Sequence, residues 1–445
     1  MMKRVIAFML AVALMGSTLV GCGNSQKQED SNQAKTESTD KAATVEEPAG
    51  DEPVTLKMVL WDLSSATYIQ PILDAYKEIK PNVTIETIDI PSNEYQDKLS
   101  IMLSGGDDSD IISVKDIPGY SAMLTKNQID PLNEYIERDQ IDLAQYSGVT
   151  DELLVNDNLY ALPFRSDFWV LFYNKGIFDK AGVPYPTNDM TWAEYEEIAK
   201  KVTSGSGADK IYGGLHHTWR STVQLATVQD GKNTVIAEDY SFMKPMYEMI
   251  TRMQKDQTIM DYASLKAGNI HYSGVFFNEQ VAMVPMGTWF IGTLISKVKE
   301  GETNADWGMV KFPHPEGVAA GTTAGTLASL AINSQSKNKE AAWDFIKFFS
   351  GPEGAKVLAE AGSLPAITNQ EVLAALGQMD GFPQDENSIS ALETETVRLE
   401  LPMHEKVSVI EQILNEEHEL ILTESLSIDE GLDNMSRRVQ EALAQ

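Results

Sequence analysis

The chain has 445 residues, of which 42% are hydrophobic, so it can bury a large core. Its 66 acidic residues outnumber the 35 lysines and arginines, which gives a formal net charge of −31. Because binding to phosphate groups needs clustered cations, this balance argues against a nucleic-acid partner. The length predicts two or three domain-sized units.

The N-terminus has the pattern of a secretory signal peptide. Lys3 and Arg4 supply positive charge, and the apolar run at 5–15 is too short to span a bilayer. The run leads to Leu-Val-Gly-Cys at 19–22, which resembles the bacterial lipobox, whose cysteine is diacylated and becomes the new N-terminus after cleavage. Cys22 is the only cysteine in the chain, so it has no partner for an internal disulfide. We expect it to be the site of lipidation.

The next thirty or so residues are polar and lack aromatic side chains. Such a composition cannot bury enough apolar surface to repay the entropy of ordering. We therefore expect residues 22–52 to be a flexible tether that holds a folded part near the outer face of a membrane.

The first part of the folded region has a β-α-β-α-β order. Alternating β-branched runs predict strands, and apolar spacings of three and four predict helices. The expected strands lie at 54–62, 83–90 and 110–116, and the expected helices at 66–80 and 94–106. This order is typical of a parallel sheet covered by helices.

Candidate ligand-binding residues stand at the ends of these strands. In open α/β sheets, ligands gather beyond the carboxyl ends of the strands. Those ends carry Trp61, Glu94, Lys115 and Asp116. For Asp116 the alternative is that its carboxylate caps the segment that follows.

A second block, with helices and glycine-rich turns, follows Pro163. Thr191 and Glu194 have the spacing of a capping box at the start of a helix. Further helices are expected at 191–204, 241–256 and 338–351, and the tail at 352–445 is expected to be mostly helical. No transmembrane segment is expected after residue 21.

Taken in order, several segments resemble the extracellular solute-binding proteins of ABC importers, in the sugar-binding group that includes maltose-binding protein. The motifs that carry the resemblance are LVGC (19–22), DIISVKD (110–116), LYALPF (159–164), LFYNKGIFDKAG (171–182), TWAEYEEIAKKVT (191–203), FNEQVAMVPMGTWFIG (277–292), LAINSQSKNKEAAWDFIKFFSGPEG (330–354) and GSLPA (362–366). Each motif alone is loose, whereas their joint order is specific.

The resemblance implies an α/β fold of two lobes, each a mainly parallel sheet covered by helices, with the ligand cleft at the hinge. The three chain crossings between lobes are expected at 163–167, 322–326 and 349–352. After the signal peptide (1–21) and the tether (22–52), lobe one is then 53–163 with 326–349, and lobe two is 164–325 with 350–445.

Charged site residues are also implied by the resemblance. Asp167 occupies the place of a ligand-binding acid in the family, and Lys115 and Asp116 match family site positions. The alternative for Asp167 is a salt bridge with Arg165, which lies two positions earlier on the same strand face. Arg165 itself is either a ligand contact or part of a hinge ion pair.

Aromatic site residues follow from the chemistry of sugars, whose hydroxyls suit Asp and Arg and whose C–H faces suit flat rings. Trp289 holds the family's Gly-x-Trp position, and Trp61 and Trp219 are weaker candidates, each with core burial as the alternative. Gly325 is expected to let the backbone approach the ligand, or else to serve only as a hinge residue. Four other tryptophans are expected in the core, namely Trp169, Trp192, Trp307 and Trp343.

Signatures of enzymes are missing from the sequence. The six histidines show no HExxH or other metal-ligand spacing, and no G-x-S-x-G, P-loop or G-x-G-x-x-G motif is present. With 66 acids, a glycoside hydrolase built on paired carboxylates stays open. We expect no catalysis, no cofactor and no metal.

The sequence thus predicts a monomeric, lipid-anchored extracytoplasmic protein that captures a sugar, in particular an oligosaccharide, and delivers it to the permease subunits of an ABC transporter. Two alternatives remain. The same fold can bind a non-sugar solute, with an arginine-rich cleft favouring glycerol phosphate and carboxylates around an aromatic box favouring a polyamine. The other alternative is a lipid-anchored glycosidase or a signalling receptor.

Overall fold

The computed structural model describes residues 52–146, 148–394 and 396–445, without the side chains of residues 370 and 371. The expected signal peptide, Cys22 and the tether up to residue 51 lie outside the described residues. Among the helices within those ranges, none is long and apolar enough to cross a membrane.

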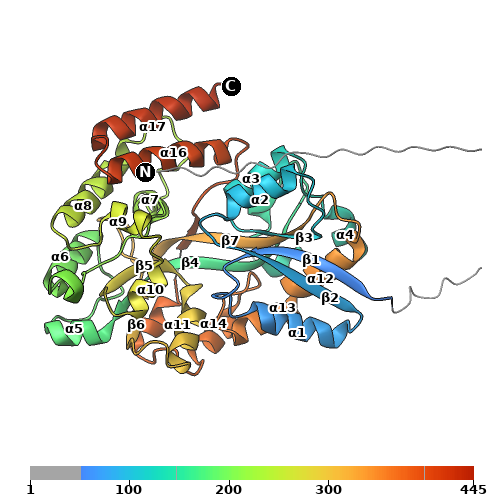
Figure 1. Ribbon diagram of the computed structural model, residues 1–445, viewed down its shortest axis with the longest axis horizontal. Coiled ribbons are helices and arrows are strands. Elements are labelled where there is room, and N and C mark those ends of the chain that lie inside the picture. Colours follow the sequence, from blue (N-terminus) through green and yellow to red (C-terminus); the bar gives the residue numbers. More distant parts are fainter. Residues whose placement is uncertain (1–51, 147, 395) are drawn as a thin grey trace, which may run out of the picture. The chain divides into compact units, whose positions relative to one another are not determined.

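The N-terminal strands form the parallel sheet that the sequence predicts. Strand β1 (Val54–Trp61) pairs in parallel with β2 (Val83–Ile90) on one side and with β3 (Ile111–Val114) on the other. Helices α1 (Ile69–Ile79) and α2 (Tyr95–Ser104) make the two crossovers. In Figure 1, α1 lies on one face of these strands and α2 on the opposite face. The predicted β-α-β-α-β order is confirmed.

Two long strands continue the sheet. Strand β7 (Thr322–Ile332) pairs antiparallel with β3 and with the first half of β4 (Leu162–Asn174). The second half of β4 pairs antiparallel with β5 (Met283–Gly287) and β6 (Trp307–Lys311). The main path of the sheet is therefore β2-β1-β3-β7-β4-β5.

This arrangement confirms the mixed α/β class and refines it. The pairs around β1 are parallel, whereas β4 runs antiparallel to every strand it pairs with. The short strand β8 (Thr396–Leu399) adds a parallel pair to β7, in a tail that was expected to be mostly helical.

Helices account for most of the remaining chain. The capping box of Thr191 and Glu194 is present at the start of α6, as predicted. The helices after α2 are α3 (Ile117–Thr125), α4 (Asn133–Arg138), α5 (Lys175–Ala181), α6 (Trp192–Val202), α7 (Ser221–Val228), α8 (Lys244–Lys255), α9 (Tyr262–Ala267), α10 (Tyr272–Phe277), α11 (Phe290–Lys299), α12 (Lys339–Ser350), α13 (Pro352–Glu360), α14 (Gln370–Gly377), α15 (Glu386–Ala391), α16 (Val407–Leu422) and α17 (Ile428–Leu443).

The core consists of the two faces of the sheet and the helices that cover them. Both halves of β4 are almost wholly buried, which explains its continuous apolar and aromatic sequence. The four tryptophans expected in the core are buried, namely Trp169, Trp192, Trp307 and Trp343.

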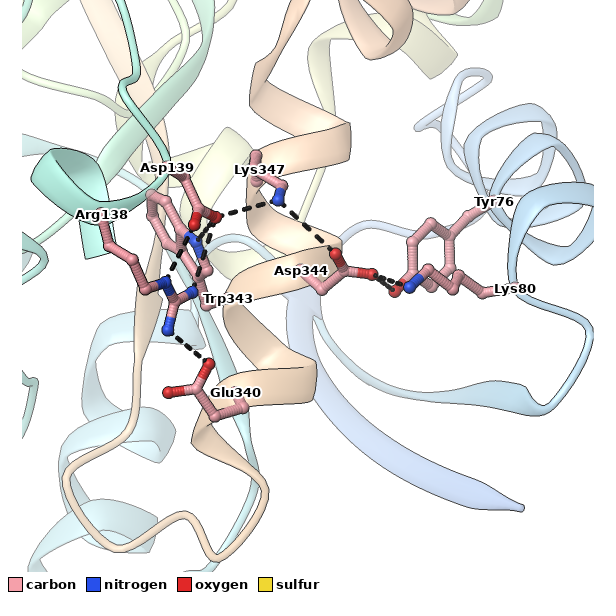
Figure 2. Close-up of polar contacts among 8 residues, drawn as sticks. All are labelled: Tyr76, Lys80, Arg138, Asp139, Glu340, Trp343, Asp344 and Lys347. Carbon is pink, nitrogen blue, oxygen red and sulfur yellow. Dashed lines mark hydrogen bonds and ion pairs between the residues drawn. The ribbon is translucent and has the colours of Figure 1, made fainter. Parts of the chain in front are cut away.

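A polar cluster centred on Asp139 fixes α12 to the end of α4 (Figure 2). The Asp139 carboxylate accepts hydrogen bonds from Trp343 Nε1 at 2.8 Å and Lys347 Nζ at 2.9 Å, both on α12. It also accepts from Arg138 Nε at 2.9 Å, and Arg138 in turn donates to Glu340 at 2.8 Å. These donors hold the pKa of Asp139 well below its usual range.

The same helix is tied to α1 through Asp344 (Figure 2). Its carboxylate accepts from Tyr76 Oη at 3.0 Å and pairs with Lys80 Nζ at 3.2 Å. Lys347, also on α12, lies between Asp139 and Asp344, with its ammonium group 2.9 Å from the first carboxylate and 3.7 Å from the second. Helix α12, which covers the centre of the sheet, is therefore anchored on both flanks.

Candidate ligand-binding site

A cavity of about 840 Å³ lies where the carboxyl ends of β1 and β3 meet the middle of β7 and the segments around α7, α10 and α16. Seven of the predicted site residues line it, namely Trp61, Lys115, Asp116, Arg165, Trp219, Trp289 and Gly325. Glu94 and Asp167 do not. The structure thus brings together residues that are up to 264 positions apart, from Trp61 to Gly325.

Aromatic rings form one wall of the cavity. Trp289 donates a hydrogen bond from Nε1 to the hydroxyl of Tyr272 at 3.1 Å. Trp219 packs edge-on against both, with ring centroids 5.7 Å from Tyr272 and 6.3 Å from Trp289. Trp219 and Trp289 are only half-buried, so ring surface remains open to the cavity. Rings held in this way offer the flat apolar faces that suit the C–H surface of a sugar.

Two further aromatic residues, Trp61 and Tyr68, line the cavity from the β1 side. Trp61 is half-buried and packs edge-on against Tyr95 with centroids 5.4 Å apart. Tyr68 accepts a hydrogen bond at its hydroxyl from Arg165 Nη1 at 3.0 Å, and the guanidinium lies 5.4 Å from its ring centroid. These contacts fix the position of Arg165 beside the cavity.

Arg165 and Asp167 form a buried ion pair. Arg165 Nε lies 2.6 Å from Asp167 Oδ2, and the two side chains are 10% and 1% exposed. The other carboxylate oxygen accepts from Thr288 Oγ1 at 2.8 Å. Burial raises the pKa of Asp167, while Arg165 and Thr288 act in the opposite direction. In the structure, Arg165 and Asp167 therefore form the salt bridge that was the alternative to a ligand contact.

Lys115 and Asp116 lie just after β3, and each makes hydrogen bonds within the protein. Lys115 Nζ donates to the carbonyl of Ser92 at 2.8 Å, and burial lowers its pKa. Asp116 accepts from the backbone N–H of Gly119 at 2.8 Å and from Gln96 Nε2 at 2.9 Å, which makes it the N-cap of α3. The capping alternative for Asp116 is thus present, although the residue also lines the cavity.

Glu94 does not line the cavity, whereas Gly325 lines it and also meets a neighbouring strand. Glu94 forms an exposed ion pair with Lys98, one turn further along α2. Gly325 lies in β7, where a Cβ would stand 2.5 Å from Val397 Cγ1 and 2.8 Å from the Asp167 carbonyl oxygen. Glycine at 325 is therefore required by the close approach of neighbouring strands.

Several residues that line the cavity were not predicted from the sequence. Tyr68 and Tyr272 resemble ordinary core aromatics at helix starts, and only the tertiary fold turns them to the cavity. Glu400 follows β8, and burial raises its pKa to about 7. Arg220, next to α7, forms an ion pair with Glu411 of α16.

Acids outnumber cations around the cavity. Seven acids line it, namely Asp62, Asp97, Asp116, Glu400, Glu411, Glu416 and Glu419. Five cations line it, namely Lys115, Lys126, Arg165, Arg220 and Lys266. Three of them are ion-paired, Arg165 with Asp167, Arg220 with Glu411 and Lys266 with Glu419. Within residues 52–445 apart from the two gaps, no group of three or more side chains is placed to hold a metal ion.

Comparison with known proteins gives a match to one family. The family described as bacterial extracellular solute-binding protein matches residues 61–356 of the chain. This range contains the last residue of β1, the strands from β2 to β7 and most of the cavity lining.

Individual relatives agree with that match. A crystal structure of a sugar transporter from Rhizobium etli, in an open conformation, is 49% identical with a TM-score of 0.70 and covers 87% of this chain and 99% of its own. An ABC substrate-binding protein from Listeria monocytogenes, in complex with cycloalternan, has a TM-score of 0.75 at 21% identity and covers 88% of this chain and 100% of its own. The sn-glycerol-3-phosphate-binding periplasmic protein of Rhizobium meliloti (strain 1021) is 25% identical over 373 residues, which are 75% of this chain and 80% of the relative.

Proposed function

The chain belongs to the bacterial extracellular solute-binding proteins, and from that membership we propose that it captures a carbohydrate in the cavity and delivers it to an ABC permease. Proteins of this family bind solutes for ABC transporters and perform no catalysis, which agrees with the missing enzyme signatures. What remains to be assigned is the solute and the way in which the protein is held at the membrane.

The arrangement of Trp61, Trp219, Tyr272 and Trp289 supports a sugar. These rings surround a cavity whose volume of about 840 Å³ can hold more than one pyranose ring. Polar groups of Lys115 and Arg165 lie among the rings, as the mixed surface of a sugar requires. The 49% identical sugar transporter supports the same class. We therefore propose an oligosaccharide as ligand.

Glycerol phosphate is the main competing solute, because one relative at 25% identity is named for it. A phosphate group needs cations that are free to pair with it. In the cavity, Arg165 and Arg220 are already neutralised by Asp167 and Glu411. The pairing of these two arginines, in a lining where acids outnumber cations, thus argues against a phosphate-bearing solute.

Closure of two lobes about a hinge is the proposed mechanism. Strands β4 and β7 and the junction of α12 with α13 contain the three expected crossings, so the lobes would be 53–163 with 326–349 and 164–325 with 350–445. A ligand that contacts both sides of the cavity favours the closed form by its differential affinity, and the permease then recognises that form.

Attachment through a lipid on Cys22 is proposed for the mature chain, which would act as a monomer on the outer face of the membrane. The support is the lipobox-like sequence at 19–22 after an apolar run. Replacement Cys22→Ser is expected to move the protein from the membrane fraction to the soluble fraction on cell fractionation. Retention of the variant in the membrane would contradict lipidation at this residue.

The ligand assignment rests most directly on the open ring faces of Trp219 and Trp289. Titration calorimetry with maltose, maltotriose, mannobiose, glycerol 3-phosphate and spermidine tests it. We expect a sugar to bind, and Trp289→Ala to weaken binding by roughly 10-fold or more, since one stacked ring contributes about 1–3 kcal/mol. Tyr185→Ala, which removes an exposed aromatic side chain outside the cavity lining, is the matched control. Binding of glycerol 3-phosphate alone would overturn the sugar assignment, and release of shorter sugars would reveal a hydrolase.

A further inference from the structure

Glu400 occupies a fixed position in the cavity wall. Its backbone N–H donates to the carbonyl of Gly325 at 2.9 Å, and its own carbonyl accepts from Gln224 Nε2 at 3.0 Å. These two bonds hold it between β7 and α7, immediately after β8. The side chain lines the cavity beside Trp219 and Leu399.

The Glu400 carboxylate has unused capacity to accept hydrogen bonds. Oε2 accepts from Trp169 Nε1 at 3.4 Å, and Ser221 offers a second donor. A carboxylate has about four acceptor positions, so both donors together leave room for a ligand. Among the described residues, no Lys or Arg nitrogen lies within ion-pair distance of it. This distinguishes Glu400 from Asp167 and Glu411, whose charges are already compensated.

Three charged side chains from different segments act on the ionisation of Glu400. Glu411 on α16 disfavours its ionised form, and Arg220, next to α7, favours it. Lys115 at the end of β3 interacts with it across the cavity. Burial is the largest cause of the shift, and with Glu411 it outweighs the cations and raises the pKa of Glu400 to about 7, so its charge depends on pH near neutrality.

We propose that Glu400 is a ligand-contacting residue of the binding site, whose carboxylate accepts a hydrogen bond from a hydroxyl group of the bound sugar. This inference rests on the proposed function, since it names a group that contacts the bound sugar. A hydroxyl donates a stronger hydrogen bond to an ionised carboxylate than to a neutral carboxyl group. Ligand binding therefore favours the ionised form and releases a proton, and affinity increases as the pH rises through neutrality.

The test is the pH dependence of sugar affinity in the full mature chain. The dissociation constant for maltotriose, or for the sugar of the above panel that binds most tightly, is measured between pH 5 and pH 8. If the ligand lowers the pKa by about one unit, affinity is about 10-fold higher at pH 8 than at pH 5. The variant Glu400→Gln is expected to lose this dependence, whereas Glu393→Gln, an exposed acid shortly before β8, keeps it.

A merely structural role for Glu400 makes a different prediction. If the carboxylate only supports Trp169, Glu400→Gln changes the affinity equally at all pH values. A flat pH profile in the parent protein, or the same slope in Glu400→Gln, overturns the inference while leaving sugar binding intact. Absence of binding to every sugar would instead contradict the proposed function.

The pKa of Glu400 can also be measured in the free protein, independently of any sugar. In the free protein, ¹³C NMR of labelled glutamate carboxyl groups, with the Glu400→Gln spectrum as assignment control, reports the titration of Glu400. A midpoint near pH 7 supports the inference, and a midpoint below pH 5 overturns it whichever sugar binds.

Discussion

The buried pair of Arg165 and Asp167 permits a sharp test of how this region is stabilised. The replacement Asp167→Asn keeps the size of the side chain and lets its amide oxygen accept from Thr288, but it removes the negative charge. Arg165 then carries an uncompensated charge at 10% exposure, with the neutral hydroxyl of Tyr68 as a remaining partner.

Breaking one half of a buried ion pair costs about 3–5 kcal/mol, because the remaining charge stays desolvated. We expect Asp167→Asn to lower the free energy of unfolding by about 3 kcal/mol, since Tyr68 supplies part of the lost interaction. The double replacement Arg165→Met with Asp167→Asn removes the stranded charge and is expected to recover about 2 kcal/mol or more.

The assay is urea unfolding followed by the fluorescence of the seven tryptophans, with midpoints and slopes compared among the parent, both single variants and the double variant. A loss below about 1 kcal/mol in Asp167→Asn would refute the ion-pair reasoning. A double variant less stable than Asp167→Asn would refute it as well. If Asp167 were instead a direct ligand contact, the main effect would fall on sugar affinity.

Three further predictions concern other sites. Asp139→Asn should cost about 1–3 kcal/mol at neutral pH, and because the pKa of Asp139 is lowered in the folded chain, the difference in urea midpoints from the parent should shrink progressively as the pH falls below about 4 and vanish only below the lowered folded-state pKa. Asn93, after β2, donates to Asn269, after α9, at 2.7 Å, and both line the cavity, so Asn93→Ala should speed sugar release in stopped-flow measurements by roughly 2- to 10-fold, with no change if the bond does not hold the proposed closed form. Gly325→Val should destabilise the chain by about 2 kcal/mol or more in thermal unfolding, because its side chain would overlap neighbouring strands, and a neutral effect would show that the strands can separate.

Much of the fold follows from local pattern. The strands expected at 54–62 and 83–90, from their alternating β-branched residues, are observed at 54–61 and 83–90, and the capping box at Thr191 marks the start of α6. Strand β8 was missed, because its four half-buried or exposed residues carry no clear apolar periodicity, and their pairing depends on β7 at the centre of the sheet.

The cavity lining was predictable where a polar or aromatic residue lies at the end of a strand or in a family motif, as for Trp61 and Trp289. It was not predictable for Tyr272 and Glu400, whose roles arise from distant segments that meet only in the folded chain. Spacing identified Arg165 and Asp167 as facing the same way, but sequence alone could not decide whether they contact each other or a ligand.

The continuity of β4 and β7 has a consequence for how the protein melts. Residues 162–168 of β4 share ladder hydrogen bonds with β7, while 169–174 continue without a break into the pairs with β5 and β6. Unfolding of one proposed lobe would therefore remove strand partners from the sheet of the other lobe and expose its apolar faces. The proposed lobes are thermodynamically coupled through these strands, and a calorimetric scan of the folded part should show a single cooperative transition despite its size.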